Sequence, residues 1–123
     1  RHAIRHAFSH NGIDWSRSPE AAIMPEGDDH AFARPCVIRD GGRLQMWYAV
    51  RGRAYRIGYA ISDDGNRWTR RDDDIGIDVS ENGWDSEMLC YPFVFDHKGE
   101  RYLLYNGNGY GRTGFGIAIL VKD

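Results

Sequence analysis

The chain has 123 residues, of which 41% are hydrophobic, and this is enough for one modest domain with a core. Its formal net charge of -2 argues against a nucleic-acid or anionic-membrane partner, because phosphate binding needs a clustered positive field. No apolar run approaches the roughly 20 residues that cross a bilayer, so no membrane-spanning helix is expected.

The sequence predicts a succession of short strands joined by tight, Gly-rich turns. Apolar and aromatic runs bounded by Gly, Asn and Asp are hairpin signals. The first strand is followed by a turn at residues 10–12, and the second gives way to a loop at residues 19–26. The predicted strands cover residues 4–9, a segment opening on Trp15, and residues 36–39, 43–50, 55–62, 67–72, 91–96, 101–106 and 114–121.

The chain also resembles itself at two spacings. Pro35 aligns with Pro92, 57 residues later, and Arg34 then aligns with Tyr91. At a spacing of 53, residues 4–15 match residues 57–68 as a strand, a Gly turn and a Trp. Internal repeats near this period are typical of propellers or arrays.

These spacings divide the chain into three parts of a repeated four-stranded meander. Residues 4–24 are expected to form the end of one blade, residues 28–78 a complete blade, and residues 84–121 three strands of the next. Unpaired strand edges at both ends are prone to pair with other chains, which favours a homo-oligomer or a chain that lacks N-terminal blades.

Three patterns suggest a metal or cofactor, but their context argues against each. Three histidines within residues 2–10 are spaced by four, yet they lie on a predicted strand and are expected at the surface. The acidic run at residues 72–74 lacks the rest of a calcium loop and is expected to be a solvated turn. Residues 109–114 spell a bare dinucleotide fingerprint, but a strand follows them, so a wide hairpin is expected. We therefore predict no metal and no cofactor.

The two cysteines, Cys36 and Cys90, do not make a disulfide framework. They occupy non-equivalent repeat positions, so we expect two reduced, buried thiols on strands. No signal-peptide pattern opens the chain, which begins on Arg1. The compartment is weakly determined, with the cytoplasm slightly favoured.

Several motifs resemble the five-bladed propeller superfamily of glycoside hydrolases, which includes the arabinanases, invertases and levansucrases of glycosidase families 43, 32 and 68. The motifs are Arg34-Pro35, Met46-Trp47-Tyr48, Ile57-Gly58-Tyr59-Ala60-x-Ser62-x-Asp64-Gly65-x-x-Trp68, Gly83-Trp84-Asp85-Ser86-Glu87-Met88 and Tyr105-Asn106-Gly107-Asn108. The resemblance is greatest to uncharacterised bacterial members. It implies an all-β fold, a C-terminal fragment of a five-bladed β-propeller with about two blades of four-stranded antiparallel meanders.

The resemblance also implies catalytic carboxylates at the starts of inner strands. Glycoside hydrolysis needs one carboxylic acid and one carboxylate that acts as base or nucleophile. Glu87 falls near the position of the general acid, and Asp28 or Asp29 near the start of another inner strand. The alternative for Glu87 is an ordinary loop carboxylate or an arginine partner.

Further residues near these strand starts are candidates for substrate binding. Trp84, Tyr91 and Tyr110 offer flat faces suited to sugar rings, whereas Trp15, Trp47 and Trp68 are expected to pack in the sheets. The remaining candidates are polar: His30, Arg34, Asp85, Asn106 and Asn108.

Each polar candidate has a structural alternative. Asp85 is more simply a cap of the turn after Trp84, and Asn106 and Asn108 more simply form a turn. His30 is equally an ordinary loop histidine. Arg34 must reach either the central funnel or a buried carboxylate.

The sequence thus predicts a glycoside hydrolase-like propeller that acts on carbohydrate. This chain by itself is expected to be inactive, because it supplies too few carboxylates to complete the catalytic pair. Enzymatic activity would require the full ring. The alternatives are a noncatalytic carbohydrate-binding module and a structural assembly module.

Overall fold

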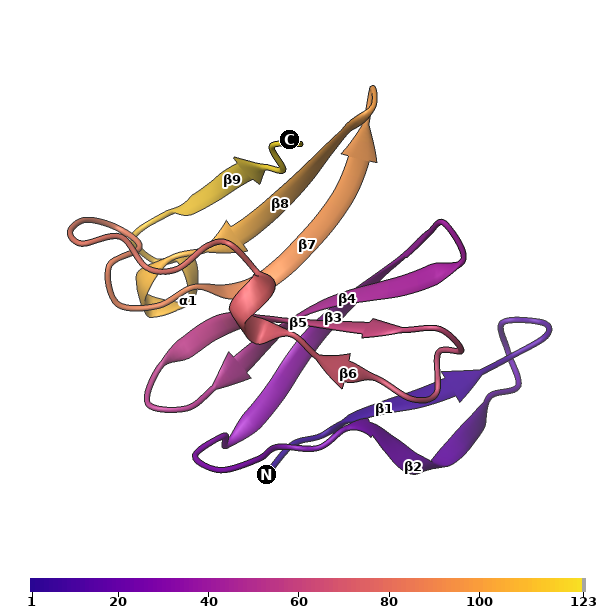
Figure 1. The fold of residues 1–123 in the computed structure, drawn as a ribbon. Coiled ribbons are helices and arrows are strands. Elements are labelled where there is room, and N and C mark those ends of the chain that lie inside the picture. The colour runs from indigo at the N-terminus through magenta and orange to yellow at the C-terminus, as the bar shows by residue number, and fades with distance from the viewer. Residues whose placement is uncertain (123) are drawn as a thin grey trace.

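The computed structural model describes residues 1–122 as three antiparallel sheets that follow one another in chain order (Figure 1). The first sheet holds β1 (Ile4–Phe8) and β2 (Ser16–Ile23). The second holds β3 (Ala31–Asp40), β4 (Arg43–Arg51), β5 (Tyr55–Ser62) and β6 (Thr69–Arg70). The third holds β7 (Cys90–His97), β8 (Glu100–Asn106) and β9 (Phe115–Ile119). Two short helical turns, η1 (Asp72–Asp74) and α1 (Asn108–Gly111), lie between strands.

The predicted all-β fold of antiparallel meanders is therefore confirmed, and two local predictions are wrong. The expected loop from residue 19 is strand, because β2 continues to Ile23 and pairs there with Ile4. The strand expected at residues 67–72 shortens to β6, since η1 follows it directly. The wide hairpin expected after β8 is confirmed, because β8 pairs with β9 and Gly109, Gly111 and Gly114 all have positive φ; the connection also contains the short turn α1.

Strand β4 lies at the centre of the molecule and is buried on both faces. Side chains alternate along a strand, so successive residues of β4 enter different cores. Met46, Tyr48 and Val50 pack toward β1 and β2, where Ile4 and Ile23 are also buried. Trp47, which alternates with them on β4, lies in a second core together with residues of the third sheet. One apolar strand thus holds the three sheets together.

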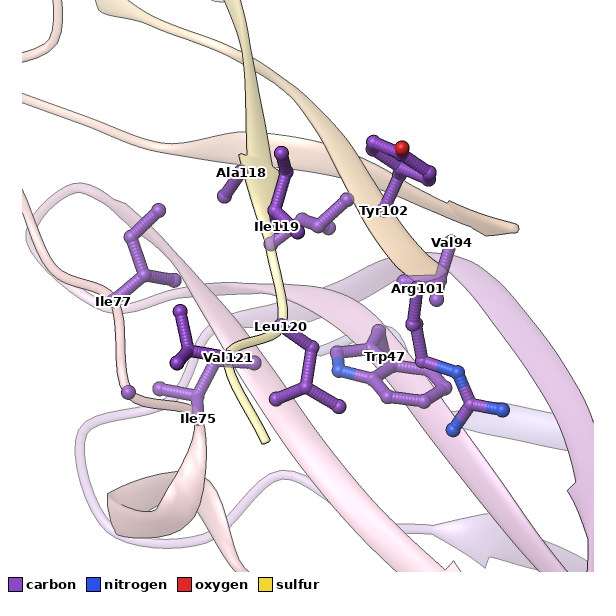
Figure 2. A pocket seen from close by; sticks show the side chains of 12 residues that line it. Trp47, Ile75, Ile77, Val94, Arg101, Tyr102, Ala118, Ile119, Leu120 and Val121 are labelled. Carbon is purple, nitrogen blue, oxygen red and sulfur yellow. The ribbon is translucent and has the colours of Figure 1, made fainter. Parts of the chain in front are cut away.

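The second core fills the space between the second and third sheets. Its buried members are Trp47, Ile57, Leu89, Val94 and Tyr105. A cavity of about 290 Å³ opens beside this core, next to β9 (Figure 2). Leu120 and Val121, from the segment after β9, and Trp47, from β4, are among the residues that line it (Figure 2).

Two turns between strands use the same hydrogen bonds. Ser62 Oγ accepts a bond of 2.8 Å from the amide of Gly65, and Ser9 Oγ accepts one of 2.8 Å from Gly12. The side chain of Asp64 in one turn and Asn11 in the other accepts two further amide bonds. Both sets of hydrogen bonds hold a glycine at positive φ, which explains why Gly12 and Gly65 occur at these positions.

The described residues contain no helix of the length and apolarity needed to cross a membrane.

Candidate functional site

The residues predicted from the sequence gather at one end of the second and third sheets. We call it the leading end, because β3 and β7 both begin there. Asp28, Asp29 and His30 precede β3, and the amide of His30 donates to the carbonyl of Arg51 at 2.7 Å. Residues 84–88 precede β7. Cys90 pairs with Asn106, so the loop after β8 returns to the same end.

The start of β5 connects the two groups. Arg51 and Tyr55 are register partners across the β4–β5 hairpin, which places Tyr55 beside the segment before β3. On the other side, the carbonyl of Tyr55 accepts a 3.1 Å bond from the amide of Leu89. Arg56 Nη1 donates to the carbonyl of Glu87 at 2.9 Å. The strand starts that carry Asp28 and Glu87 are therefore held together by one hairpin.

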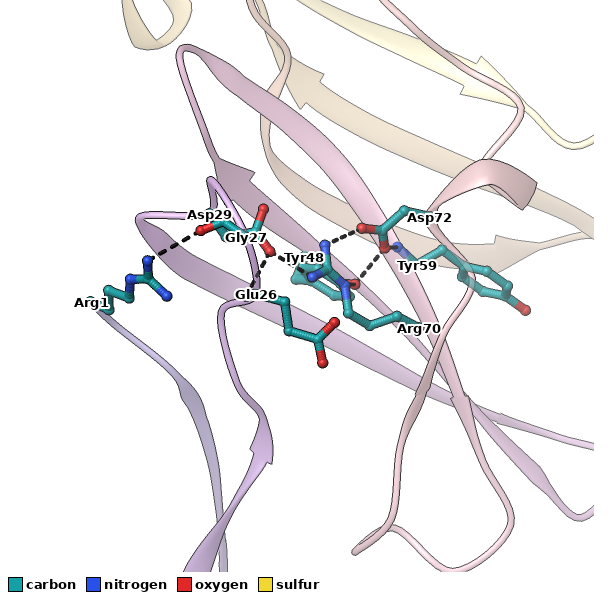
Figure 3. A network of polar contacts seen from close by, with 8 residues as sticks. All are labelled: Arg1, Glu26, Gly27, Asp29, Tyr48, Tyr59, Arg70 and Asp72. Carbon is teal, nitrogen blue, oxygen red and sulfur yellow. Dashed lines mark hydrogen bonds and ion pairs between the residues drawn. The ribbon is translucent and has the colours of Figure 1, made fainter.

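The two adjacent aspartates before β3 have different surroundings. Oδ2 of Asp29 accepts a 2.6 Å bond from Arg70 Nη1 and a 3.2 Å bond from the amide of Glu26 (Figure 3). Asp28 is exposed, and within residues 1–122 no cation pairs with it. Asp29 is thus engaged inside the fold, while Asp28 remains available to a ligand.

Arg70 is the centre of a polar network that the sequence analysis missed. Its Nε donates to the Tyr48 hydroxyl at 3.2 Å, and its Nη2 pairs with Asp72, which also accepts from the Tyr48 hydroxyl (Figure 3). Burial, followed by the Asp72 carboxylate, raises the pKa of Tyr48. Burial opposes ionisation of Arg70, but the bonds to Asp72 and Asp29 outweigh it and raise the pKa of the guanidinium.

This network corrects one prediction in part and shows why Arg70 was not predicted. The acidic run at residues 72–74 was expected to be a solvated turn; Asp73 and Asp74 are exposed, but Asp72 is half-buried and ties η1 to β4. Arg70 follows Trp68 by two residues and appears in the sequence as one arginine among many. The one sequence feature that could have indicated its role is its position on a predicted strand next to an acidic turn, and that pattern does not show which carboxylate the arginine would pair with.

Glu87 is exposed, but its backbone is firmly held. Its amide and that of Met88 both donate to Oδ1 of Asn108, at 2.8 and 3.2 Å. The nitrogen of the same Asn108 side chain, Nδ2, donates to the carbonyl of Gly83 at 3.1 Å. Asn108 is buried and braces the loop before β7. Within residues 1–122, no cation pairs with the Glu87 carboxylate.

Trp84 and Asp85 point toward the interior of the third sheet. Trp84 is half-buried and stacks on Tyr105, with ring centroids 5.6 Å apart and planes 20° from parallel. Gly116 makes room for it, since a Cβ there would lie 2.5 Å from Trp84 Cη2. Asp85 is buried and accepts a bond of 3.5 Å from the Tyr105 hydroxyl. These contacts give both residues a packing role.

Three tyrosines form an aromatic cluster at the leading end. Tyr91 lies 5.9 Å from Tyr55 and 6.1 Å from Tyr110 between ring centroids, and Tyr55 lies 5.8 Å from Tyr110. Tyr110 is held by Asn106, whose Nδ2 donates to its carbonyl at 3.3 Å. Tyr55 was not a sequence candidate, because only the pairing of β4 with β5 brings it to this end. We call these three residues the tyrosine cluster.

Arg34 joins the tyrosine cluster from β3. Its guanidinium carbon lies 5.3 Å from the centroid of the Tyr91 ring. Arg34 and Tyr91 both precede a proline, and both have positive φ, of 53° and 56°. The strand register shifts at each place, between Ala33 and Cys36 and between Cys90 and Phe93. The same local distortion thus presents both side chains.

Within the described residues, no three His, Cys, Asp or Glu side chains lie close enough to hold a metal ion. The site is made of carboxylates, arginines and tyrosines. Such a set can donate a proton, bind polar groups and stack on flat apolar surfaces.

The fold defined above has known counterparts among solved structures. A thermostable family-43 glycoside hydrolase matches with a TM-score of 0.73 and 20% identity, over 94% of this chain and 42% of that one. A family-32 beta-fructofuranosidase, BmSUC1 of Bombyx mori, matches with a TM-score of 0.70 and 19% identity, over 95% of this chain and 28% of that one. The chain therefore has the fold of part of a glycoside hydrolase propeller.

No family model matches the chain. Two uncharacterized proteins of Mycobacterium tuberculosis are much more similar in sequence. MT1551 of strain CDC 1551 / Oshkosh is 51% identical over 120 residues, and Rv1502 of strain ATCC 25618 / H37Rv is 50% identical over 120 residues. Each alignment covers 97% of this chain and 40% of the relative. The chain thus spans about two-fifths of the length of these curated relatives.

Proposed function

We propose that the chain is part of a five-bladed propeller that acts on carbohydrate as a glycoside hydrolase, with Glu87 as the proton donor. The observation that carries the proposal is the state of Glu87. Its carboxylate is exposed and unpaired within residues 1–122, while its backbone is fixed by Asn108 and Arg56. A proton donor needs this combination of a free acid group and a fixed position.

The tyrosine cluster supplies the adjoining surface for a sugar. Tyr110 is exposed and Tyr91 is partly exposed, so their rings are available for stacking against a pyranose or furanose face. Arg56 links this cluster to the acid, because it donates to the carbonyls of both Tyr55 and Glu87 at 2.9 Å.

The second carboxylate of the reaction is expected from outside this chain or from Asp28. Asp29 is a poor candidate because its carboxylate already bonds Arg70, and its loss would leave that cation unpaired. Asp28 has no such contact with any described residue and lies before the neighbouring inner strand. We therefore propose that this chain binds sugar at the leading end but does not turn it over by itself.

The test is a binding and turnover screen of the chain with a panel of oligosaccharides. Glu87→Gln removes the acid with little change in shape, and Glu100→Gln, at the opposite end of the third sheet, is the control of matched charge. We expect sugar binding by the wild type, altered affinity in Glu87→Gln and unchanged affinity in Glu100→Gln. Binding of no saccharide, or equal behaviour of both variants, would exclude the proposal.

A second candidate function is assembly, supported by the outer face of the third sheet. Two cross-strand rows on this face are apolar: Phe93, Leu104 and Ile117, then Phe95, Tyr102 and Ile119. Phe93 is 57% exposed and Ile117 is 56% exposed. The rows contain no charge, so the face is complementary to itself, as a two-fold interface requires. We propose that a second copy of this chain covers it.

A further inference from the structure

If the leading end binds carbohydrate as proposed, its side chains also indicate the chemical class of the sugar. We propose that Arg34 binds an anionic group of the saccharide, a carboxylate or a sulfate, while the sugar ring stacks on the tyrosine cluster. Charged and uncharged sugars of the same size would then be distinguished by one guanidinium.

The first support is the backbone of Arg34. Proline disfavours the α region of backbone conformation for the residue that precedes it, and a positive φ is uncommon for any residue other than glycine. Arg34 has both features, with φ at 53° before Pro35. Strained conformations of this kind persist where the fold over-determines them, and they cluster at binding and active sites. Here the strain directs a long cationic side chain out of β3 and onto Tyr91 of the next sheet.

The second support is the state of the guanidinium. Its Cζ lies over the Tyr91 ring, 5.3 Å from the ring centroid, and such a cation–π contact uses none of its N–H donors. Arg34 is exposed, and within residues 1–122 it has no carboxylate partner and donates no hydrogen bond. The sequence had left two options open, a ligand in the funnel or a buried carboxylate. The described part of the chain offers no such carboxylate.

The third support is the shape match between this edge and an anion. Planar guanidinium donors bind a carboxylate, or two oxygens of a sulfate, through two parallel bonds. A neutral sugar hydroxyl uses one such donor at a time and leaves the charge uncompensated. Because the Arg34 guanidinium carbon lies 5.3 Å from the centroid of the Tyr91 ring, an anionic substituent of a sugar on the tyrosine cluster would lie close to it.

The surrounding charge is mixed, so the selectivity is assigned to Arg34 itself. Arg51, Arg53 and Arg112 are exposed around the leading end and have no carboxylate partner among residues 1–122, and Asp28 and Glu87 are exposed there too. Long-range attraction is therefore weak and screened by salt, whereas a paired contact to one guanidinium is short-ranged. The proposal predicts a preference that survives moderate salt.

The experiment measures affinity by titration calorimetry for three probes of equal length: galactotriose, trigalacturonic acid and a sulfated galactotriose. We expect an acidic probe to bind about tenfold more tightly than the neutral one. The carboxylated and sulfated arms identify which anion is recognised. Arg34→Gln should remove the preference without abolishing binding of the neutral probe. Arg39→Gln is the control, since it is exposed on the same strand near the far end and has the same charge change.

The outcomes separate this inference from the function on which it rests. Equal binding of neutral and acidic probes would overturn the anion preference and leave the carbohydrate function standing. Binding of no probe would remove both. An equal effect of Arg34→Gln and Arg39→Gln would show general charge attraction and overturn the role of Arg34. Arg34→Lys keeps the charge but not the planar donors, so full wild-type affinity in that variant would also overturn the proposed recognition.

Discussion

Tyr48 and Gly58 are register partners on β4 and β5, and the ring of Tyr48 occupies the space that any side chain at position 58 would need. A Cβ at Gly58 would lie 2.3 Å from Cε2 of Tyr48. Tyr48 is fully buried and is also the donor to Asp72, so it has no free volume into which it can move. The Tyr48 ring also belongs to the core that the central sheet shares with β1 and β2.

Gly58→Ala is therefore expected to destabilise the protein by about 2 kcal/mol, because overpacking a filled core displaces backbone or side chains. Urea denaturation measures the loss in the free energy of unfolding. Gly52→Ala is the control, since its φ is not positive and the nearest atom to its Cβ is a carbonyl oxygen 3.9 Å away. Equal stability of both variants would show that Tyr48 can move aside.

The hydroxyl of Tyr48 provides a second prediction. Tyr48→Phe removes the hydroxyl that Asp72 and Arg70 share in a half-buried position. We expect the free energy of unfolding to fall by about 1 to 2 kcal/mol at neutral pH. Tyr59→Phe is the control, because within residues 1–122 the Tyr59 hydroxyl bonds only Gln45, in a more open position. A larger loss in Tyr59→Phe than in Tyr48→Phe would contradict the central role of the network.

The same variant predicts a change in pH dependence. Burial raises the pKa of Tyr48 above the ordinary tyrosine value of about 10. Above that pH the unfolded chain loses the Tyr48 proton while the folded protein keeps it, so the free energy of unfolding falls as pH rises. Tyr48→Phe lacks this contribution, and its stability should fall less steeply with pH. Urea denaturation midpoints of the wild type and of Tyr48→Phe, measured below and above the ordinary tyrosine pKa, give the dependence of stability on pH for each protein.

The two cysteines are both free, and they are predicted to react differently. Cys90 is fully buried, and burial raises the pKa of its thiol from 9.0 to about 11, which lowers its thiolate fraction about a hundredfold. Cys36 is partly exposed and bonds the backbone of Val94. Mass spectrometry after brief treatment with iodoacetamide should find label on Cys36 first and on Cys90 only after unfolding. Equal labelling of both in the native protein would contradict the burial of Cys90.

Most of the fold was predictable because its signals are local. The Gly turns of Ser9–Gly12 and Ser62–Gly65 are specified by their own side chains, and the continuous apolar run in β4 is typical of a strand buried on both faces. The candidate site was only partly predictable. The repeat spacing brought Arg34 and Tyr91 into equivalent positions, but their contact depends on how two sheets pack. Arg70 with Asp29, and Tyr55 with Tyr110, join residues that are distant in sequence and whose types do not indicate a partner.

The outer face of the third sheet provides the last prediction. β9 is an edge strand, and Phe115, Ile117 and Ile119 are all more than half exposed along it. An edge of this kind pairs with other chains unless a charge interrupts it, so we expect the mass measured by sedimentation to rise with protein concentration. Ile117→Lys should keep the protein monomeric, while Ile13→Lys, at a 79% exposed position in the turn before β2, should associate like the wild type. A wild type that stays monomeric across the accessible concentrations would exclude self-association through this face.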